Sequence, residues 1–239
     1  MYIDIKELYG RKLGATDGDI GHVKDFYFDD KSWAIRYLVV DTGSWLTGRL
    51  VLLSSHAFGA QTFEWSNADA KFIEVNLTRK QIENSPSIDT HRPVSRQYEE
   101  DYFKYYGWPN YWQDTGLFGL GALPVVIPPP ESSDSPHHGH IRRDDVHLRS
   151  SKSITGYQIH ATDGAIGTVS SFIMHGSTWS IRELVVETGH WYAGKPILLL
   201  PENIIRISYE DSTVYVNLTK EDIRRTTKNN IAQAAFVQH

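Results

Sequence analysis

The chain has 239 residues, of which 40% are hydrophobic and 22% charged, and its formal net charge is −5. This composition is typical of a globular protein and excludes a disordered chain, and the negative charge gives no general attraction to nucleic acid or anionic lipid. The absence of cysteine from the sequence excludes disulfides, thiolate catalysis and cysteine-ligated metal clusters.

The first ten residues, MYIDIKELYG, carry charges every few positions and lack the apolar stretch of a signal peptide. The longest uncharged stretch, residues 116–130, is rich in proline and too short to span a bilayer, which takes about 20 helical residues. We therefore expect a cytoplasmic protein, with peripheral attachment at the inner membrane as an open alternative.

Residues 1–83 predict a small antiparallel β unit that ends in a short helix after Thr78. The first strand ends at the turn ATDG, in which Asp17 and Gly18 are typical of a tight hairpin connection. Gly21, three residues later, indicates a bulge or a close approach of two backbones. The strands predicted after this turn cover residues 20–28, 33–40, 50–53, 63–65 and 72–75.

The sequence then repeats itself. ATDGDIGHV in the first copy returns as ATDGAIGTV in the second, and VNLTRKQI returns as VNLTKEDI. Between residues 10 and 53, about 21 of 44 positions are identical at a shift of 146. The second copy therefore predicts the same β unit, with Asp163, Gly164 and Gly167 in its turn and bulge.

The Thr-Asp-Gly triplet of each turn is also compatible with a catalytic or metal-binding role. One aspartate and one threonine in each copy supply too few oxygen ligands for calcium or magnesium. Because Asp-Gly between two strands is a strong hairpin signal, we assign Asp17 and Asp163 a structural role.

Residues 84–147 differ in character from both copies. Seven aromatic residues occupy the eleven positions from 102 to 112, and large aromatic side chains dominate the energetics of interfaces. Two interpretations stay open: the segment is a clasp that packs within the chain, or it is a surface for a partner or a second copy. The candidates for partner contact are Tyr105, Trp108, Tyr111 and Trp112.

Four histidines, His137, His138, His140 and His147, follow in a stretch rich in proline and serine. Histidines bind transition metals, but such a stretch offers no outer shell of hydrogen bonds to orient them. We therefore predict no metal site and no cofactor. The sequence also lacks the GxSxG, HExxH, P-loop and dinucleotide-binding motifs, so we expect no enzymatic activity.

Taken together, ATDGDIGHVKDF, IRYLVVDTGSW and GRLVLL resemble the PRC-barrel domain, and so do their counterparts in the second copy. The segment DVHLRSSKSITGYQIHATDGAIGTVSSF is also similar to the cytoplasmic barrel of the photosynthetic reaction centre H subunit. The resemblance implies a mainly β protein with two SH3-like barrels, each followed by a short C-terminal helix. It divides the chain into repeat 1 (residues 1–83), an aromatic-rich linker (84–147) and repeat 2 with its tail (148–239).

The family resemblance also implies a bacterial, non-enzymatic module for protein–protein contacts or assembly. The expected partners are proteins, with a membrane complex or a second copy of the chain among the options. The alternative is a soluble relative of the reaction-centre H subunit, associated with photosynthetic electron transport or a light-harvesting complex. A role in RNA or ribosome binding, known for another class of the family, is disfavoured by the negative charge.

Overall fold

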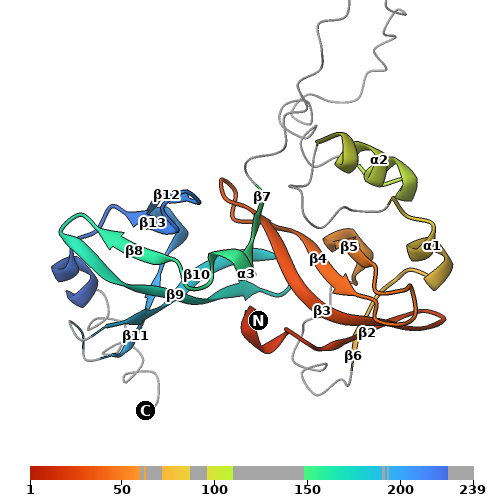
Figure 1. Cartoon of the computed structure of the whole chain (residues 1–239), viewed down its shortest axis with the longest axis horizontal. Helices are drawn as coiled ribbons and strands as arrows, with labels where there is room; N and C mark the ends of the chain where they lie inside the picture. Colours follow the sequence, from red (N-terminus) through yellow and green to blue (C-terminus); the bar gives the residue numbers. More distant parts are fainter. Residues whose placement is uncertain are drawn as a thin grey trace, which may run out of the picture. The chain divides into compact units, whose positions relative to one another are not determined.

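The computed structural model describes residues 1–59, 62, 72–86, 96–109, 148–189, 192 and 194–225. The chain forms two compact units, one made of Met1–Asn84 with His147–His239 and the other of Ser85–Val146. Both repeats therefore belong to a single unit (Figure 1).

Repeat 1 forms a sheet with the strand order β5-β4-β3-β2-β6. Its strands are β1 (Tyr2–Asp4), β2 (Lys12–Ala15), β3 (Gly18–Asp29), β4 (Ile35–Asp41), β5 (Leu50–Ser54) and β6 (Phe72–Glu74). Its helices are the 3-10 turns η1 (Ile5–Glu7) and η2 (Ser55–Ala57) and the terminal helix α1 (Arg79–Glu83). The strand predicted at residues 63–65 lies outside the described residues.

Repeat 2 forms a second sheet with the strand order β11-β10-β9-β8-β13-β12. The strands formed by the residues of repeat 2 are β7 (Leu148–Ser150), β8 (Gln158–Ala161), β9 (Gly164–His175), β10 (Ser180–Thr188), β11 (Pro196–Leu199), β12 (Ile204–Ser208) and β13 (Thr213–Val216). Helix α3 (Ser151–Ile154) follows β7, and the 3-10 turn η5 (Pro201–Asn203) follows β11. The predicted mainly β architecture is confirmed. Among the described residues neither sheet closes on itself, so closure into a barrel stays a prediction.

Each repeat contributes its first strand to the sheet of the other repeat. Strand β1 pairs antiparallel with β9, with Tyr2 opposite His175, and β7 pairs antiparallel with β3, with Leu148 opposite Asp29. Both members of one pair are 146 residues from their counterparts in the other, so the two pairings are equivalent. Figure 1 shows β7 lying beside β3. The repeats are thus joined by a reciprocal exchange of strands.

A second contact between the repeats joins equivalent residues. Ala34 forms an antiparallel bridge with Ser180, its own counterpart in repeat 2. Beside this bridge the amide of Ile35 donates to the carbonyl of Trp179, and the equivalent amide of repeat 2 donates to the carbonyl of Trp33, both at 2.7 Å. Because these contacts are unchanged when the repeats are interchanged, a pseudo-twofold axis passes through the bridge.

The two tryptophans beside the axis have unusual backbone conformations. Trp33 and Trp179 have φ angles of +56° and +51°, which are uncommon for bulky residues. Strand β4 therefore begins at Ile35, two residues later than predicted. The strain is offset by packing: the ring of Phe28 stacks on Trp33 at 5.4 Å, and the ring of Phe58 lies 4.8 Å from Trp179.

The hydrophobic core continues from one repeat into the other. Phe28 of β3 and Phe172 of β9 are fully buried, and their ring centroids are 5.5 Å apart. Ile82 of α1 and Ile223, its counterpart in repeat 2, are also buried. None of the helices in the described part of the chain combines the length and apolar character needed to cross a membrane.

The connecting unit is described by the 11-residue helix α2 (Arg96–Tyr106) and a few residues on either side of it. Tyr102 and Phe103 of this helix are buried, and their rings pack edge to face at 5.9 Å. The aromatic-rich sequence therefore forms a helix at its beginning.

Candidate functional site

The duplicated ATDG turn holds the segment that precedes the terminal helix of the same repeat. In repeat 1 the amide of Thr16 donates to the carbonyl of Leu77 at 3.0 Å. The carboxylate of Asp17 accepts a hydrogen bond of 2.7 Å from the amide of Arg79, the first residue of α1. The aspartate of the turn is therefore a ligand for one of the free amides at the start of a helix.

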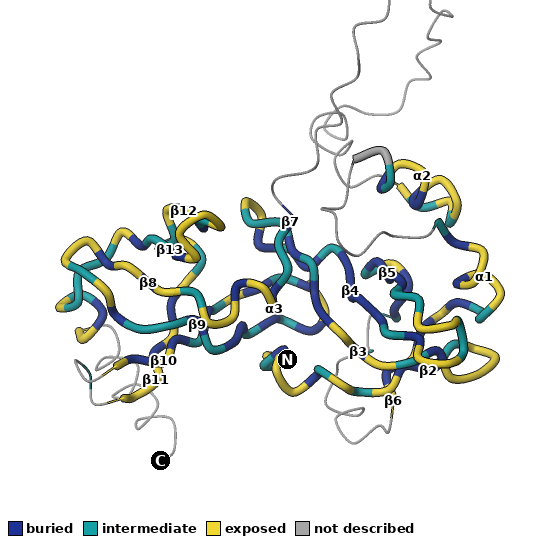
Figure 2. Tube along the Cα trace, in the orientation of Figure 1, coloured by how far each residue is buried: buried dark blue, intermediate teal, exposed yellow. Residues whose placement is uncertain are grey.

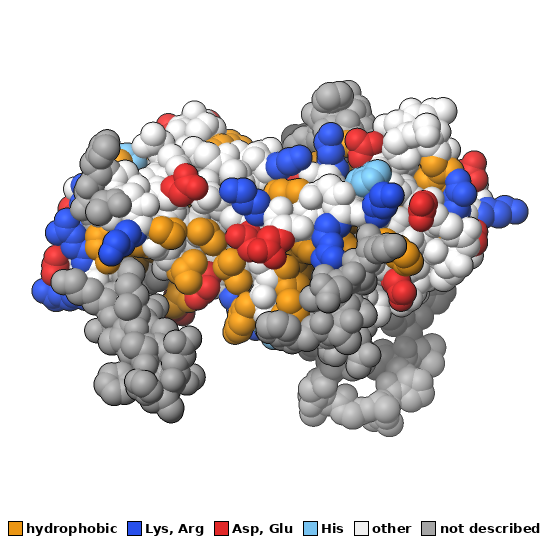
Figure 3. All heavy atoms as spheres, turned by 90° about the horizontal axis from the view of Figure 1, so that it is seen from below, with side chains coloured by type: hydrophobic (Ala, Val, Ile, Leu, Met, Phe, Trp, Pro, Cys, Tyr) orange, Lys and Arg blue, Asp and Glu red, His pale blue; other side chains and the backbone are white. Residues whose placement is uncertain are grey.

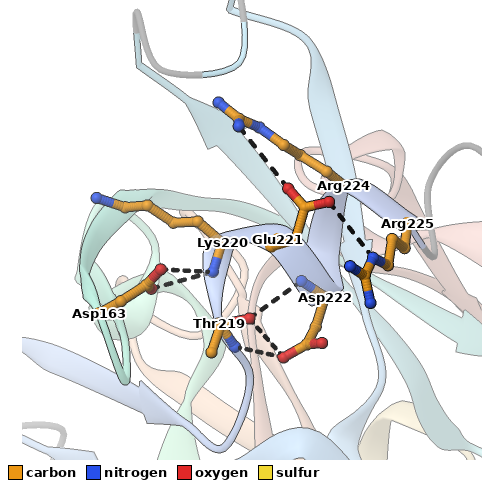
Figure 4. Close-up of polar contacts among 7 residues, drawn as sticks. All are labelled: Asp163, Thr219, Lys220, Glu221, Asp222, Arg224 and Arg225. Carbon is orange, nitrogen blue, oxygen red and sulfur yellow. Dashed lines mark hydrogen bonds and ion pairs between the residues drawn. The ribbon is translucent and has the colours of Figure 1, made fainter.

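Repeat 2 has the same arrangement (Figure 4). The carboxylate of Asp163 accepts from the amide of Lys220 at 3.0 Å. Next to it, Thr219 and Asp222 form a reciprocal cap, since each backbone amide donates to the side chain of the other residue. The hydrogen bonds from Thr219 hold the pKa of Asp222 below its usual range. These contacts give the two turns a structural role.

The glycines after the turns permit a close approach between backbones. A Cβ atom on Gly21 would lie 2.1 Å from the carbonyl oxygen of Asp41, and one on Gly167 would lie 2.0 Å from that of Glu187. Both glycines lie in β-bulges between the first two strands of the hairpin. A side chain at either position would push two strands apart.

The four predicted contact residues of the linker are only partly described. Tyr105 is 41% exposed, and Trp108 is half-buried with its ring stacked on Tyr106 at 4.5 Å. Tyr111 and Trp112 lie outside the described residues, as do the four histidines of the linker. The described residues contain no cluster of three or more side chains suited to a metal ion. The clasp and the interface both stay predictions for the linker.

The outer faces of the two sheets differ in exposure, although their strands are equivalent. In repeat 1, Val39 of β4 and Leu52 of β5 are 3% and 2% exposed. In repeat 2 their counterparts are Val185 of β10, which is half-buried, and Leu198 of β11, which is 48% exposed. Figure 2 shows β4 as buried over most of its length and β11 with exposed segments. Repeat 2 therefore carries an open apolar face that repeat 1 lacks.

A hollow of about 630 Å³ lies beside this face, where β1, β10 and η5 meet. Its apolar lining includes Tyr2 and Leu200, which are 65% and 43% exposed. The full lining consists of Tyr2, Ser32, Trp33, Ser180, Ile181, Arg182, Glu183, Leu200, Pro201 and Glu202. We call Tyr2, Val185, Leu198 and Leu200, with this hollow, the repeat 2 face.

The repeats differ in the residue that follows their 3-10 turns η2 and η5, which is larger in repeat 1. There Phe58 packs against Trp179. In repeat 2 the equivalent residue is Ile204, which has a smaller side chain.

The charged groups of the hollow are two carboxylates and one guanidinium. Glu183 and Glu202 form no ion pair with any described residue, and Arg182 is the single cation of the described lining. The hydroxyl of Ser32 accepts a hydrogen bond from Arg36, and the hydroxyls of Ser180 and Thr178 are hydrogen-bonded to each other. On the surface in Figure 3, hydrophobic side chains gather around a group of acidic ones. This chemistry suits recognition of a surface with apolar and basic groups.

The comparison with known families concerns repeat 1. Residues 2–82 match the family model of the PRC-barrel domain. The matched range runs from the exchanged strand β1 to Ile82 of the terminal helix, so it includes the turn of Asp17 and the bulge of Gly21. No curated protein matches the chain.

Inspection of the sequence did not select the residues of the repeat 2 face. A signal was present in the comparison of the matched repeat with its second copy. Tyr37 and Ser54, both buried in repeat 1, correspond to Glu183 and Leu200 in repeat 2. A buried tyrosine replaced by glutamate, beside a serine replaced by leucine, indicates that the two faces have different surroundings.

Proposed function

We propose that the protein is a non-enzymatic interaction or assembly module built from two PRC-type barrels in tandem. The second repeat is included because it shares the duplicated motifs, the strand order and the turn-to-helix contacts of the matched repeat. The observation that carries the proposal is the repeat 2 face, where large apolar side chains stay exposed although their counterparts in repeat 1 are buried.

The expected occupant is a protein segment with apolar side chains and at least one lysine or arginine. Apolar side chains such as Leu198 and Leu200 gain from being covered, at roughly 25 cal/mol per Å² of apolar surface. Glu183 and Glu202 lie beside them without ion-pair partners among the described residues, so a basic side chain would complete the contact. An anionic ligand such as RNA would instead meet these carboxylates.

The test starts with a photo-crosslinking residue at Leu198, introduced in the cells that make the protein. We expect one defined protein to be captured at this position and not at Ile205, which is 63% exposed on β12 and outside the repeat 2 face. With the purified partner, Leu198→Asp is expected to raise the Kd at least tenfold, whereas Ile205→Asp leaves it unchanged.

Circular dichroism and thermal melts establish that both variants are folded before binding is measured. If Leu198→Asp binds with wild-type affinity and replacement of Tyr105 or Trp108 weakens binding, the interface lies on the linker and not on the repeat 2 face. If no protein is captured at Leu198 and the wild-type protein binds RNA with a Kd that rises steeply with salt, a protein partner is rejected.

A further inference from the structure

The two junctions at which the repeats exchange their first strands contain the same pair of residue types in opposite order. At the β1–β9 junction, the hydroxyl of Ser171 donates to the carboxylate of Asp4. At the β7–β3 junction, the hydroxyl of Ser150 donates to the carboxylate of Asp25 at 2.5 Å. Positions 4 and 150 are counterparts, and so are positions 25 and 171. The exchanged strand supplies the carboxylate in the β1–β9 junction and the hydroxyl in the β7–β3 junction.

In each junction the carboxylate accepts from two equivalent donors, a serine hydroxyl and a lysine amide, and Asp25 accepts in addition from the amide of Phe26 at 2.7 Å and the hydroxyl of Ser151 at 2.9 Å. Asp4 also accepts the amide of Lys6 at 2.8 Å, and Asp25 accepts the amide of Lys152, the counterpart of Lys6, at 3.1 Å. The carboxylate therefore occupies one equivalent place in both junctions, although it comes from the exchanged strand in one and from the receiving sheet in the other. Asp25 is only 8% exposed. A buried site of this kind suits one carboxylate with hydrogen-bond donors.

If the first strand of a repeat paired with the sheet of an identical repeat, the junction would contain either two carboxylates or none. If β1 lay on the sheet of repeat 1 in the same register, Asp4 would face Asp25, and two carboxylates with little access to water would repel each other. If β7 lay on the sheet of repeat 2, Ser150 would face Ser171 and the junction would lack its charge-assisted hydrogen bond. These mismatches arise whether the wrong partner is the same repeat or the identical repeat of a second chain.

We propose that these two Asp–Ser pairs form a pairing code that makes each repeat specific for the other and excludes pairing between identical repeats. The code explains how two repeats of similar sequence form one compact unit with a defined partner choice. It is a recognition surface whose partner is the other half of the same chain. It goes beyond the proposed function, because it does not depend on which protein binds the repeat 2 face.

The first test is a double-mutant cycle in the full chain with Asp25→Ser and Ser150→Asp. Ser150 is the N-cap residue of α3, and aspartate caps a helix as well as serine does. The Ser150→Asp variant therefore keeps the cap but places two carboxylates in the junction, and we expect its Tm to fall by about 5 °C or more. Asp25→Ser removes the carboxylate and also lowers the Tm. The double variant restores one carboxylate and recovers most of the loss.

The second test measures partner choice. Residues 131–136 are replaced by the recognition site of a specific protease, and the folded protein is cut there and examined by native mass spectrometry. The cut wild-type protein is expected to give only pairs of unlike halves. The cut Asp25→Ser/Ser150→Asp protein has an aspartate on both exchanged strands and a serine on both sheets, so pairs of like halves should also form after denaturation and refolding.

Two results would overturn the pairing code. One is a double variant whose Tm loss equals the sum of the single losses, which would mean that Asp25 has only a local role in its own repeat. The other is a cut wild-type protein that forms like and unlike pairs in statistical proportion after refolding. The paired variants Asp4→Ser and Ser171→Asp repeat the cycle at the β1–β9 junction.

Discussion

Replacing Gly21 with alanine tests the close backbone approach in the first β-bulge. The new Cβ atom would lie 2.1 Å from the carbonyl oxygen of Asp41, whereas ordinary contacts begin at 3.4 Å, so the two strands must separate by about 1.3 Å. Overpacking of this kind costs about 1–3 kcal/mol, and a φ of +133° adds about 1–3 kcal/mol of strain for alanine. We expect a loss of about 4 kcal/mol in the free energy of unfolding.

The control is Gly10→Ala in the same repeat. Gly10 also has a positive φ, +77°, but nothing lies within 4 Å of the Cβ atom that would be added. Its replacement should cost only the conformational strain of alanine at a positive φ, about 1–2 kcal/mol. Gly167→Ala and Gly156→Ala form the equivalent pair in repeat 2, since a Cβ on Gly167 would lie 2.0 Å from a carbonyl oxygen and one on Gly156 would meet nothing within 4 Å.

Urea unfolding followed by circular dichroism measures all four variants against the wild-type protein. A loss of about 4 kcal/mol corresponds to a Tm decrease of roughly 8–16 °C for a unit of this size. If Gly21→Ala and Gly10→Ala lose the same free energy of unfolding within about 0.5 kcal/mol, the close approach to Asp41 is not the reason why position 21 requires glycine.

Three further predictions concern other parts of the chain. Asp17→Ala and Asp163→Ala should each cost about 1 kcal/mol in urea unfolding, because each removes an acceptor for a helix amide, and unchanged midpoints would contradict this role. Burial raises the pKa of Tyr9 to about 12, above the value of about 10 in the unfolded chain, so the stability contributed by its neutral form is complete below pH 10 and is lost as the pH rises towards 12. The urea midpoint of the wild-type protein should therefore fall more steeply than that of Tyr9→Phe between pH 10 and 12, and parallel curves would refute this. Trp108→Ala/Trp112→Ala should leave the mass measured by light scattering unchanged and lower the Tm, as expected for a clasp, whereas a wild-type dimer that becomes a folded monomer would identify an interface.

Much of the local structure could be predicted from the sequence because it depends on residues near one another along the chain. The Asp-Gly turn at Asp17 and the capping position at Thr78 follow from turn chemistry and hydrogen bonds over a few residues. The duplication was visible as a constant shift of 146. The link between the two motifs was not visible, because the hydrogen bond from Arg79 to Asp17 spans 62 residues.

The partner of each first strand was decided only by the tertiary structure. The receiving strands β3 and β9 have equivalent sequences and the same alternation of side chains, so periodicity fits β1 equally well on either of them. The exposure of Leu198 was hidden for the same reason, since its counterpart Leu52 has the same identity and is buried. What a repeated sequence determines by itself is the unit that is repeated. Which unit meets which, and which faces stay open, depends on contacts between side chains far apart in the chain, such as Asp25 with Ser150.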